Sequence, residues 1–163
     1  MPAIPPTDIQ EVLRHLPHRF PFVLVDHVEG GEAGEWVRAV KHVSVDEPFF
    51  TTVDAGTPSM PNSLIVEALA QTGGILCFFS GLLKPLGGST SFLAVIDEAR
   101  FERQARAGET IVLECRLRRA LRGVVRLEGR ATAAGALVAE AKFTVVIRDT
   151  DGDAARDDPR NAT

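Results

Sequence analysis

The chain has 163 residues, a hydrophobic fraction of 45% and a charged fraction of 25%, the composition of one globular domain with its own core. Its net charge of −4 argues against a nucleic-acid partner, because such partners select basic surfaces. Its two cysteines, Cys77 and Cys115, match no metal-ligand spacing and no disulfide framework, so we expect buried thiols and neither a metal nor a cofactor.

The expected compartment follows from two further observations. Residues 1–6 lack the basic and apolar regions of a secretory signal. The longest apolar stretch, around Ile75 to Leu83, is interrupted by glycine and serine and is too short to cross a bilayer. We therefore expect a cytoplasmic protein that does not insert into a membrane.

The first elements of the chain are short. Thr7 can cap a helix that runs to about Leu16, where Pro17 ends it. The apolar, β-branched run Phe22–Val28 predicts a strand, and the glycines at 30, 31 and 34 predict a turn. Alternation of apolar and polar residues over Trp36–Val43 predicts a second, half-buried strand.

A loop and a long helix come next. Three prolines and a glycine within Asp46–Pro61 predict a loop, and Asn62 or Ser63 can cap the helix that follows. Leu64–Leu83 is apolar on nearly every face, which predicts a buried helix. The pair Gly73-Gly74 in its middle costs about 1–2 kcal/mol in helix propensity, so we expect it to allow close packing against a sheet.

Four strands are predicted in the second half of the chain, at Thr90–Phe101, Thr110–Leu121, Val124–Ala133 and Leu137–Arg148. Arg122-Gly123 and Ala134-Gly135 lie at the expected tight turns. Residues 150–163 lack apolar anchors, and we expect a disordered tail. The pattern predicts a single α+β domain over residues 1–149, an antiparallel sheet of about six strands wrapped around a long buried central helix.

Several stretches of the chain form a recognisable series: Leu16-Pro17-His18-Arg19-Phe20-Pro21-Phe22-Val23-Leu24-Val25-Asp26, Val43–Phe50, Met60-Pro61 with Glu67–Gln71, Ala99–Phe101, and Gly135 through Glu140-Ala141. In their order and spacing, roughly over residues 9 to 149, they resemble the β-hydroxyacyl-(acyl carrier protein) dehydratases of the FabZ type. The resemblance implies a hotdog fold, a role in fatty acid biosynthesis, and a homodimer or trimer of dimers with acyl tunnels at the dimer interface.

The family's catalytic pair is only half present in this chain. The resemblance implies that a histidine in the loop after Phe-Phe removes the proton next to the thioester carbonyl, while a glutamate on the neighbouring protomer's central helix helps the β-hydroxyl leave. Glu67 matches that glutamate, but Val53 stands at the position of the histidine. Asp54 is the nearest substitute, because two close carboxylates can divide into one acid and one base. The alternative is that Asp54 is a solvated loop residue.

The four histidines offer no obvious replacement for the missing base. His18 belongs to the shared Pro-His-Arg motif, and we expect it to help fold the N-terminal segment. His15 and His42 are expected at the surface.

The resemblance also implies sites for the substrate and its carrier. The residues expected to contact the acyl thioester are Phe49, Phe50, Pro61, Asn62, Ser63 and Gln71. Asn62 stands where the family usually has the glycine whose backbone N–H polarises the carbonyl. Arg100 and Arg103 are candidates for contact with an acidic acyl carrier protein; the alternative is a solvated strand edge.

Three functions therefore remain open. The first is a dehydratase of β-hydroxyacyl thioesters, carried on acyl carrier protein or coenzyme A, with an altered or weakened site. The second is a catalytically silent acyl-thioester-binding subunit that forms a heterodimer with an intact homologue. The third is a hotdog acyl thioesterase, in which Glu67 assists the attack of water on the acyl group.

Overall fold

The computed structural model describes residues 1–53, 57–84 and 88–150. Its main sheet has seven strands, and every neighbouring pair is antiparallel. In spatial order they are β1 (Ala3–Ile4), β2 (His27–Glu32), β3 (Trp36–His42), β8 (Thr110–Leu121), β9 (Val124–Ala133), β10 (Ala136–Asp149) and β6 (Ser89–Phe101). A second sheet contains β4 (Thr51–Val53), β5 (Thr57–Met60) and β7 (Ala105–Arg106).

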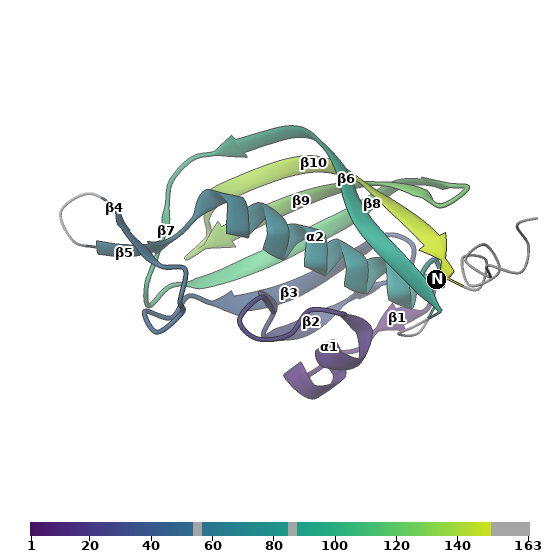
Figure 1. The fold of residues 1–163 in the computed structure, drawn as a ribbon, viewed down its shortest axis with the longest axis horizontal. Coiled ribbons are helices and arrows are strands. Elements are labelled where there is room, and N and C mark those ends of the chain that lie inside the picture. Colours follow the sequence, from purple (N-terminus) through teal and green to yellow (C-terminus); the bar gives the residue numbers. More distant parts are fainter. Residues whose placement is uncertain (54–56, 85–87, 151–163) are drawn as a thin grey trace, which may run out of the picture.

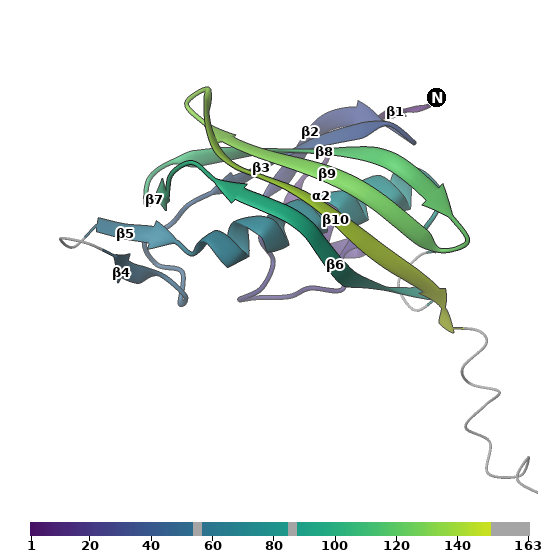
Figure 2. The ribbon, with the colours of Figure 1, turned by 90° about the horizontal axis from the view of Figure 1, so that it is seen from above.

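The long helix α2 (Asn62–Phe79) lies along the inner face of the curved main sheet (Figures 1 and 2). Its side chains Leu69 and Ile75 are fully buried, as are Leu127 and Phe143 from the sheet. Among the described residues α2 is the one helix long and apolar enough to cross a membrane, but 56% of it is buried inside the fold. It is therefore the core helix, and the predicted α+β architecture is confirmed.

Gly73 explains how the helix approaches the sheet so closely. A Cβ at this position would lie 2.8 Å from Leu127 Cδ1 and 3.3 Å from Cys115 Sγ. At Gly74 the nearest atom, Leu16 Cδ2, would be 3.6 Å away, which is ordinary contact. The close packing expected of this glycine pair is thus confirmed at Gly73. Both cysteines are buried, as predicted, and burial raises the pKa of the Cys77 thiol to about 12.

The predicted helix ends need correction. The short helix α1 (Ile9–His15) is capped by Asp8, which accepts from the Glu11 N–H at 3.0 Å, and not by Thr7. Thr7 instead pairs through its backbone with Val28 of β2. At the start of α2 the cap is Pro61, and no side chain there makes a capping hydrogen bond.

The predicted end of α2 at Leu83 is also wrong, because the helix stops at Phe79. Gly81 adopts a positive φ of 69°, and its N–H donates to Phe78 O at 3.0 Å while the Leu82 N–H donates to Cys77 O at 2.9 Å. This is the Schellman arrangement that ends helices at glycine. The apolar run continues past the helix because Leu82 and Leu83 still pack against the core.

The first predicted strand, Phe22–Val28, lies elsewhere: β2 covers His27–Glu32 and includes two of the glycines assigned to a turn. The backbone of residues 22 and 24 bonds to the Gln71 side chain and not to a neighbouring strand. The predicted loop Asp46–Pro61 likewise contains the short strands β4 and β5. The main sheet has seven strands, where about six were predicted.

The strands of the second half agree with the prediction to within one residue at each end. Both predicted turns are also present. Arg122 and Ala134 have φ of 49°, and the glycine after each has φ of 78°, as two-residue hairpin turns require. The tail predicted to be disordered falls on residues 151–163, which lie outside the described residues.

Candidate active site

A cavity of about 270 Å³ lies beside α2, and Glu67 is one of the residues that line it. Its walls come from α2, from the segment after α1, and from the first part of β6 and its neighbour β10. The lining residues are His15, Leu16, Pro17, His18, Glu67, Ala70, Gln71, Gly74, Leu83, Lys84, Ser89, Thr90, Ser91, Leu93 and Val145. The structure thus brings the predicted Glu67 and Gln71 together in one cavity.

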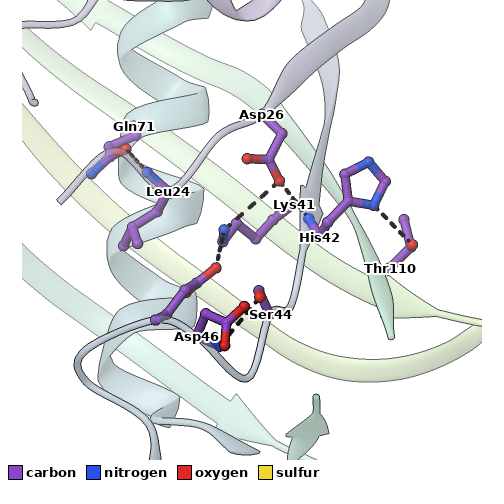
Figure 3. A network of polar contacts seen from close by, with 9 residues as sticks. Leu24, Asp26, Lys41, His42, Ser44, Asp46, Gln71 and Thr110 are labelled. Atoms are coloured by element: carbon purple, nitrogen blue, oxygen red, sulfur yellow. Dashed lines mark hydrogen bonds and ion pairs between the residues drawn. The ribbon is translucent and has the colours of Figure 1, made fainter. Parts of the chain in front are cut away.

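Gln71 fixes the orientation of Glu67. It lies four residues further along α2, on the same helix face, and its Nε2 donates to Glu67 Oε1 at 2.9 Å. The same Nε2 donates to Phe22 O at 2.9 Å, and Gln71 Oε1 accepts from the Leu24 N–H at 2.9 Å, the contact drawn in Figure 3. Because Gln71 is buried, this arrangement holds both the carboxylate and the chain segment opposite it.

His18 is the second titratable group next to Glu67. Its Nε2 lies 3.4 Å from Glu67 Oε1, and the two side chains remain 31% and 22% exposed. Arg19 Nη1 donates to Leu16 O at 2.8 Å and to His18 O at 2.7 Å, which closes the turn that carries His18. The Pro-His-Arg motif therefore places an imidazole at the cavity as well as organising the N-terminal segment.

Little in the sequence indicates the pairing of His18 with Glu67. His18 and Glu67 are far apart along the chain and occur in different motifs. The hydrogen bonds from Gln71 to Phe22 and Leu24 bring the two together, and side-chain bonds of this kind leave no periodic pattern to read.

The expected surface position of His15 is wrong. Its side chain is 9% exposed and Nε2 lies 3.3 Å from Glu11 Oε1. The ring stacks on Phe78 with centroids 4.0 Å apart, and Phe79 approaches its edge. Burial lowers the pKa of His15, against the opposing charge of Glu11. His42 is exposed as predicted.

The other predicted residues of the substrate site come from the preceding loop and the start of α2. Val53 is the last residue of β4, and Asp54 lies outside the described residues, so its pairing with Glu67 stays a prediction. Phe49 and Phe50 are half-buried, and their rings are 6.3 Å apart. Asn62 and Ser63 open α2 directly after its cap, Pro61. None of these appears among the described residues that line the Glu67 cavity.

A buried lysine holds the loop that leads to Phe49 and Phe50 (Figure 3). Lys41 Nζ lies 2.5 Å from Glu47 Oε1 and 3.7 Å from Asp26 Oδ2. Asp26 Oδ2 also accepts from the His42 N–H at 2.5 Å. One cation thus ties β3, the segment before β2 and the loop after β3 to one another.

Arg100 and Arg103, the two candidates for contact with a carrier protein, form ion pairs with acidic side chains of the same chain. Arg100 pairs with Glu102 and lies 3.7 Å from Glu140. Arg103 Nη1 lies 2.9 Å from Glu109 Oε2, and this contact holds the pKa of Glu109 below its ordinary value. Contact with a carrier protein stays a prediction for both residues.

Comparison with known proteins agrees with this architecture. A FabA-like domain matches residues 16–142. The chain is 44% identical over 142 residues to the 3-hydroxyacyl-(acyl-carrier-protein) dehydratase FabZ of Thiobacillus denitrificans, covering 87% of this chain and 98% of that protein. It is 48% identical over 134 residues to the FabZ of Salmonella arizonae, covering 82% and 87%.

Two solved structures share the fold. The dehydratase heterocomplex ApeI:P from Xenorhabdus doucetiae superposes with a TM-score of 0.74 at 19% identity, covering 89% of this chain and 95% of that chain. A hot-dog-like protein from Thermanaerovibrio acidaminovorans superposes with a TM-score of 0.60 at 22% identity, covering 76% and 88%. The expected hotdog fold is confirmed, and the chain belongs to the FabA-like family, among the relatives of the FabZ dehydratases.

Proposed function

We propose that this chain catalyses the reversible dehydration of 3-hydroxyacyl thioesters carried on acyl carrier protein, with Glu67 as a catalytic group. The observation that carries the proposal is the Glu67 carboxylate, held by Gln71 in a cavity of a chain 44–48% identical to named 3-hydroxyacyl-(acyl-carrier-protein) dehydratases. Elimination needs a group that delivers a proton to the departing hydroxyl, and a carboxyl fixed at the wall of a cavity supplies one.

The start of α2 supports a site for the thioester carbonyl. The first N–H groups of a helix have no partner within it and lie at the positive end of its dipole. At α2 they follow Pro61, and no side chain caps them. Asn62 Oδ1 is buried there without a hydrogen-bond partner among the described residues. The open N–H donors at this helix end suit a ligand carbonyl that needs polarisation, and Phe49 and Phe50 offer apolar surface.

The exposed face of β6 supports a homodimer. This strand is 13 residues long and forms one edge of the main sheet. Its large apolar side chains remain exposed, among them Phe92 at 53%, Val95 at 48% and Ile96 at 49%. Long apolar edges invite pairing with another strand. Since β6 also supplies Leu93 to the Glu67 cavity, a second copy on this edge would help to enclose the site.

A second candidate is a silent subunit paired with an intact homologue. It is favoured by valine at position 53, where the FabZ-type enzymes carry their histidine. In a mixed dimer the intact partner's histidine would face Glu67 of this chain, giving one complete site.

The test uses the purified full chain and crotonyl thioesters of acyl carrier protein and of coenzyme A. Loss of enoyl absorbance and release of free thiol are followed together. Hydration without thiol release is the result expected for the dehydratase. Thiol release that Glu67→Ala abolishes would instead identify a thioesterase. If neither signal occurs until an intact homologue is added, the chain is a silent subunit.

A further inference from the structure

We propose that His18 works with Glu67 as the acid–base pair within one protomer and replaces the base that is absent at position 53. The proposal rests on the dehydratase function given above. It assigns a catalytic role to a histidine of the Pro-His-Arg motif and requires no residue from a neighbouring chain for proton transfer.

The geometry meets the requirements for such a pair. Both side chains line the same cavity, and His18 Nε2 lies 3.4 Å from Glu67 Oε1. General bases act within about one hydrogen-bond length of the proton they remove. With 31% of its surface exposed, the His18 side chain is accessible from the cavity and yet held by its turn.

The two ring nitrogens of His18 have different surroundings. A buried polar side-chain atom normally has a hydrogen-bond partner, but Nδ1 of His18 is buried without one among the described residues. The polar contact of the ring runs from Nε2 to Glu67 Oε1. Nε2 is therefore the ring nitrogen that faces the carboxylate.

The other titratable groups of the cavity are engaged elsewhere. His15 stacks on Phe78 and faces Glu11. Lys84 Nζ lies 3.1 Å from Asp149 Oδ2. Among the described residues that line the cavity, His18 is therefore the group placed to exchange a proton with Glu67.

The reaction balances with these two groups alone. Neutral His18 takes the C2 proton through Nε2, and the electron pair of the C2–H bond forms the C2=C3 double bond. The C3–O bond breaks, and the departing hydroxyl takes the proton of the Glu67 carboxylic acid and leaves as water. His18 is then an imidazolium beside a Glu67 carboxylate, and one proton transfer across their 3.4 Å separation restores the starting state.

The first test compares four proteins in the hydration assay: the parent chain, Glu67→Gln, His18→Gln and the surface control His42→Gln. We expect His18→Gln to lower kcat by about 10²–10⁴-fold, the contribution of a positioned general base, with little change in KM. It should also flatten the acid limb of the pH–rate profile, which a merely structural role would leave in place. His42→Gln should behave as the parent does.

Chemical rescue distinguishes the loss of a catalytic base from the misfolding of a variant. Imidazoles added to His18→Ala should restore turnover in proportion to their concentration and more strongly as their basicity rises, but should not rescue Glu67→Ala. If neither the parent chain nor Glu67→Gln hydrates the thioester, the proposed function is refuted. If the parent is active and Glu67→Gln is inactive, the proposed function stands. In that case an undiminished rate of His18→Gln, or the absence of rescue, would overturn only the role of His18.

Discussion

The side-chain amide of Gln71 donates to Glu67 across one turn of α2, at 2.9 Å, from a fully buried position. The same amide bonds to the backbone of Phe22 and Leu24. One glutamine therefore joins the orientation of the carboxylate to the docking of the N-terminal segment that carries His18.

Replacing Gln71 by methionine should damage stability and activity together. The change leaves the buried Leu24 N–H without its partner, which costs about 1–3 kcal/mol, and it also removes the hydrogen bond to the partly exposed Phe22 carbonyl. Urea unfolding measures the loss, with exposed Ser63→Ala as the control for a harmless change on α2. A Gln71→Met variant with parental stability would show that water or a repacked segment satisfies these groups.

Gly73 and Gly74 should respond to alanine with opposite signs. Alanine gains about 1 kcal/mol of helix propensity over glycine, and at Gly74 the added methyl meets only ordinary contact. At Gly73 it overlaps Leu127 in a packed core, where overpacking costs about 1–3 kcal/mol. Calorimetric melting of both variants tests this. Equal shifts of the same sign would contradict the packing described at Gly73.

Lys41→Met should leave the carboxylate of Glu47 without its ion-pair partner. Removing one partner of a buried ion pair costs about 3–5 kcal/mol, and we expect the lower end because Glu47 keeps 16% exposure. The double variant Lys41→Met/Glu47→Gln should recover part of the loss, since residue 47 then carries no unpaired charge. Chemical denaturation measures the free energy of unfolding of the parent, the single variant and the double variant. A double variant less stable than Lys41→Met would refute the pairing of Lys41 with Glu47.

Stability should fall as the pH drops below about 6.5, the ordinary histidine pKa, partly because of His15. Burial lowers the pKa of His15 in the folded protein, so in this window the unfolded chain binds a proton that the folded chain does not. The contribution is present above the unfolded pKa and is lost as the pH falls toward the folded one. His15→Gln should weaken this dependence, and an unchanged slope in urea titrations at a series of pH values would contradict it.

The sequence predicted best the features that depend on local pattern. The later strands and their turns follow from alternation and from glycine after Arg122 and Ala134, and α2 follows from a run apolar on all faces. The predictions of secondary structure are wrong where hydrogen bonds that the local pattern does not show decide the backbone conformation. At Phe22, where a strand was predicted, the backbone carbonyl accepts a hydrogen bond from the Gln71 side chain. At Gly81 the backbone hydrogen bonds end α2 inside an apolar run. His18 reaches Glu67 only through the tertiary fold, so its place in the site had no local signal.

The most direct test of the central claim is the rate of crotonyl thioester hydration by the parent chain and by Glu67→Gln, with the melting temperature measured in parallel. The substitution keeps the size of the side chain and removes its exchangeable acid. We predict a loss of about 10²–10⁴-fold in kcat with melting close to that of the parent. A Glu67→Gln variant that hydrates the thioester as fast as an active parent would contradict the assignment of Glu67, and with it the site described here.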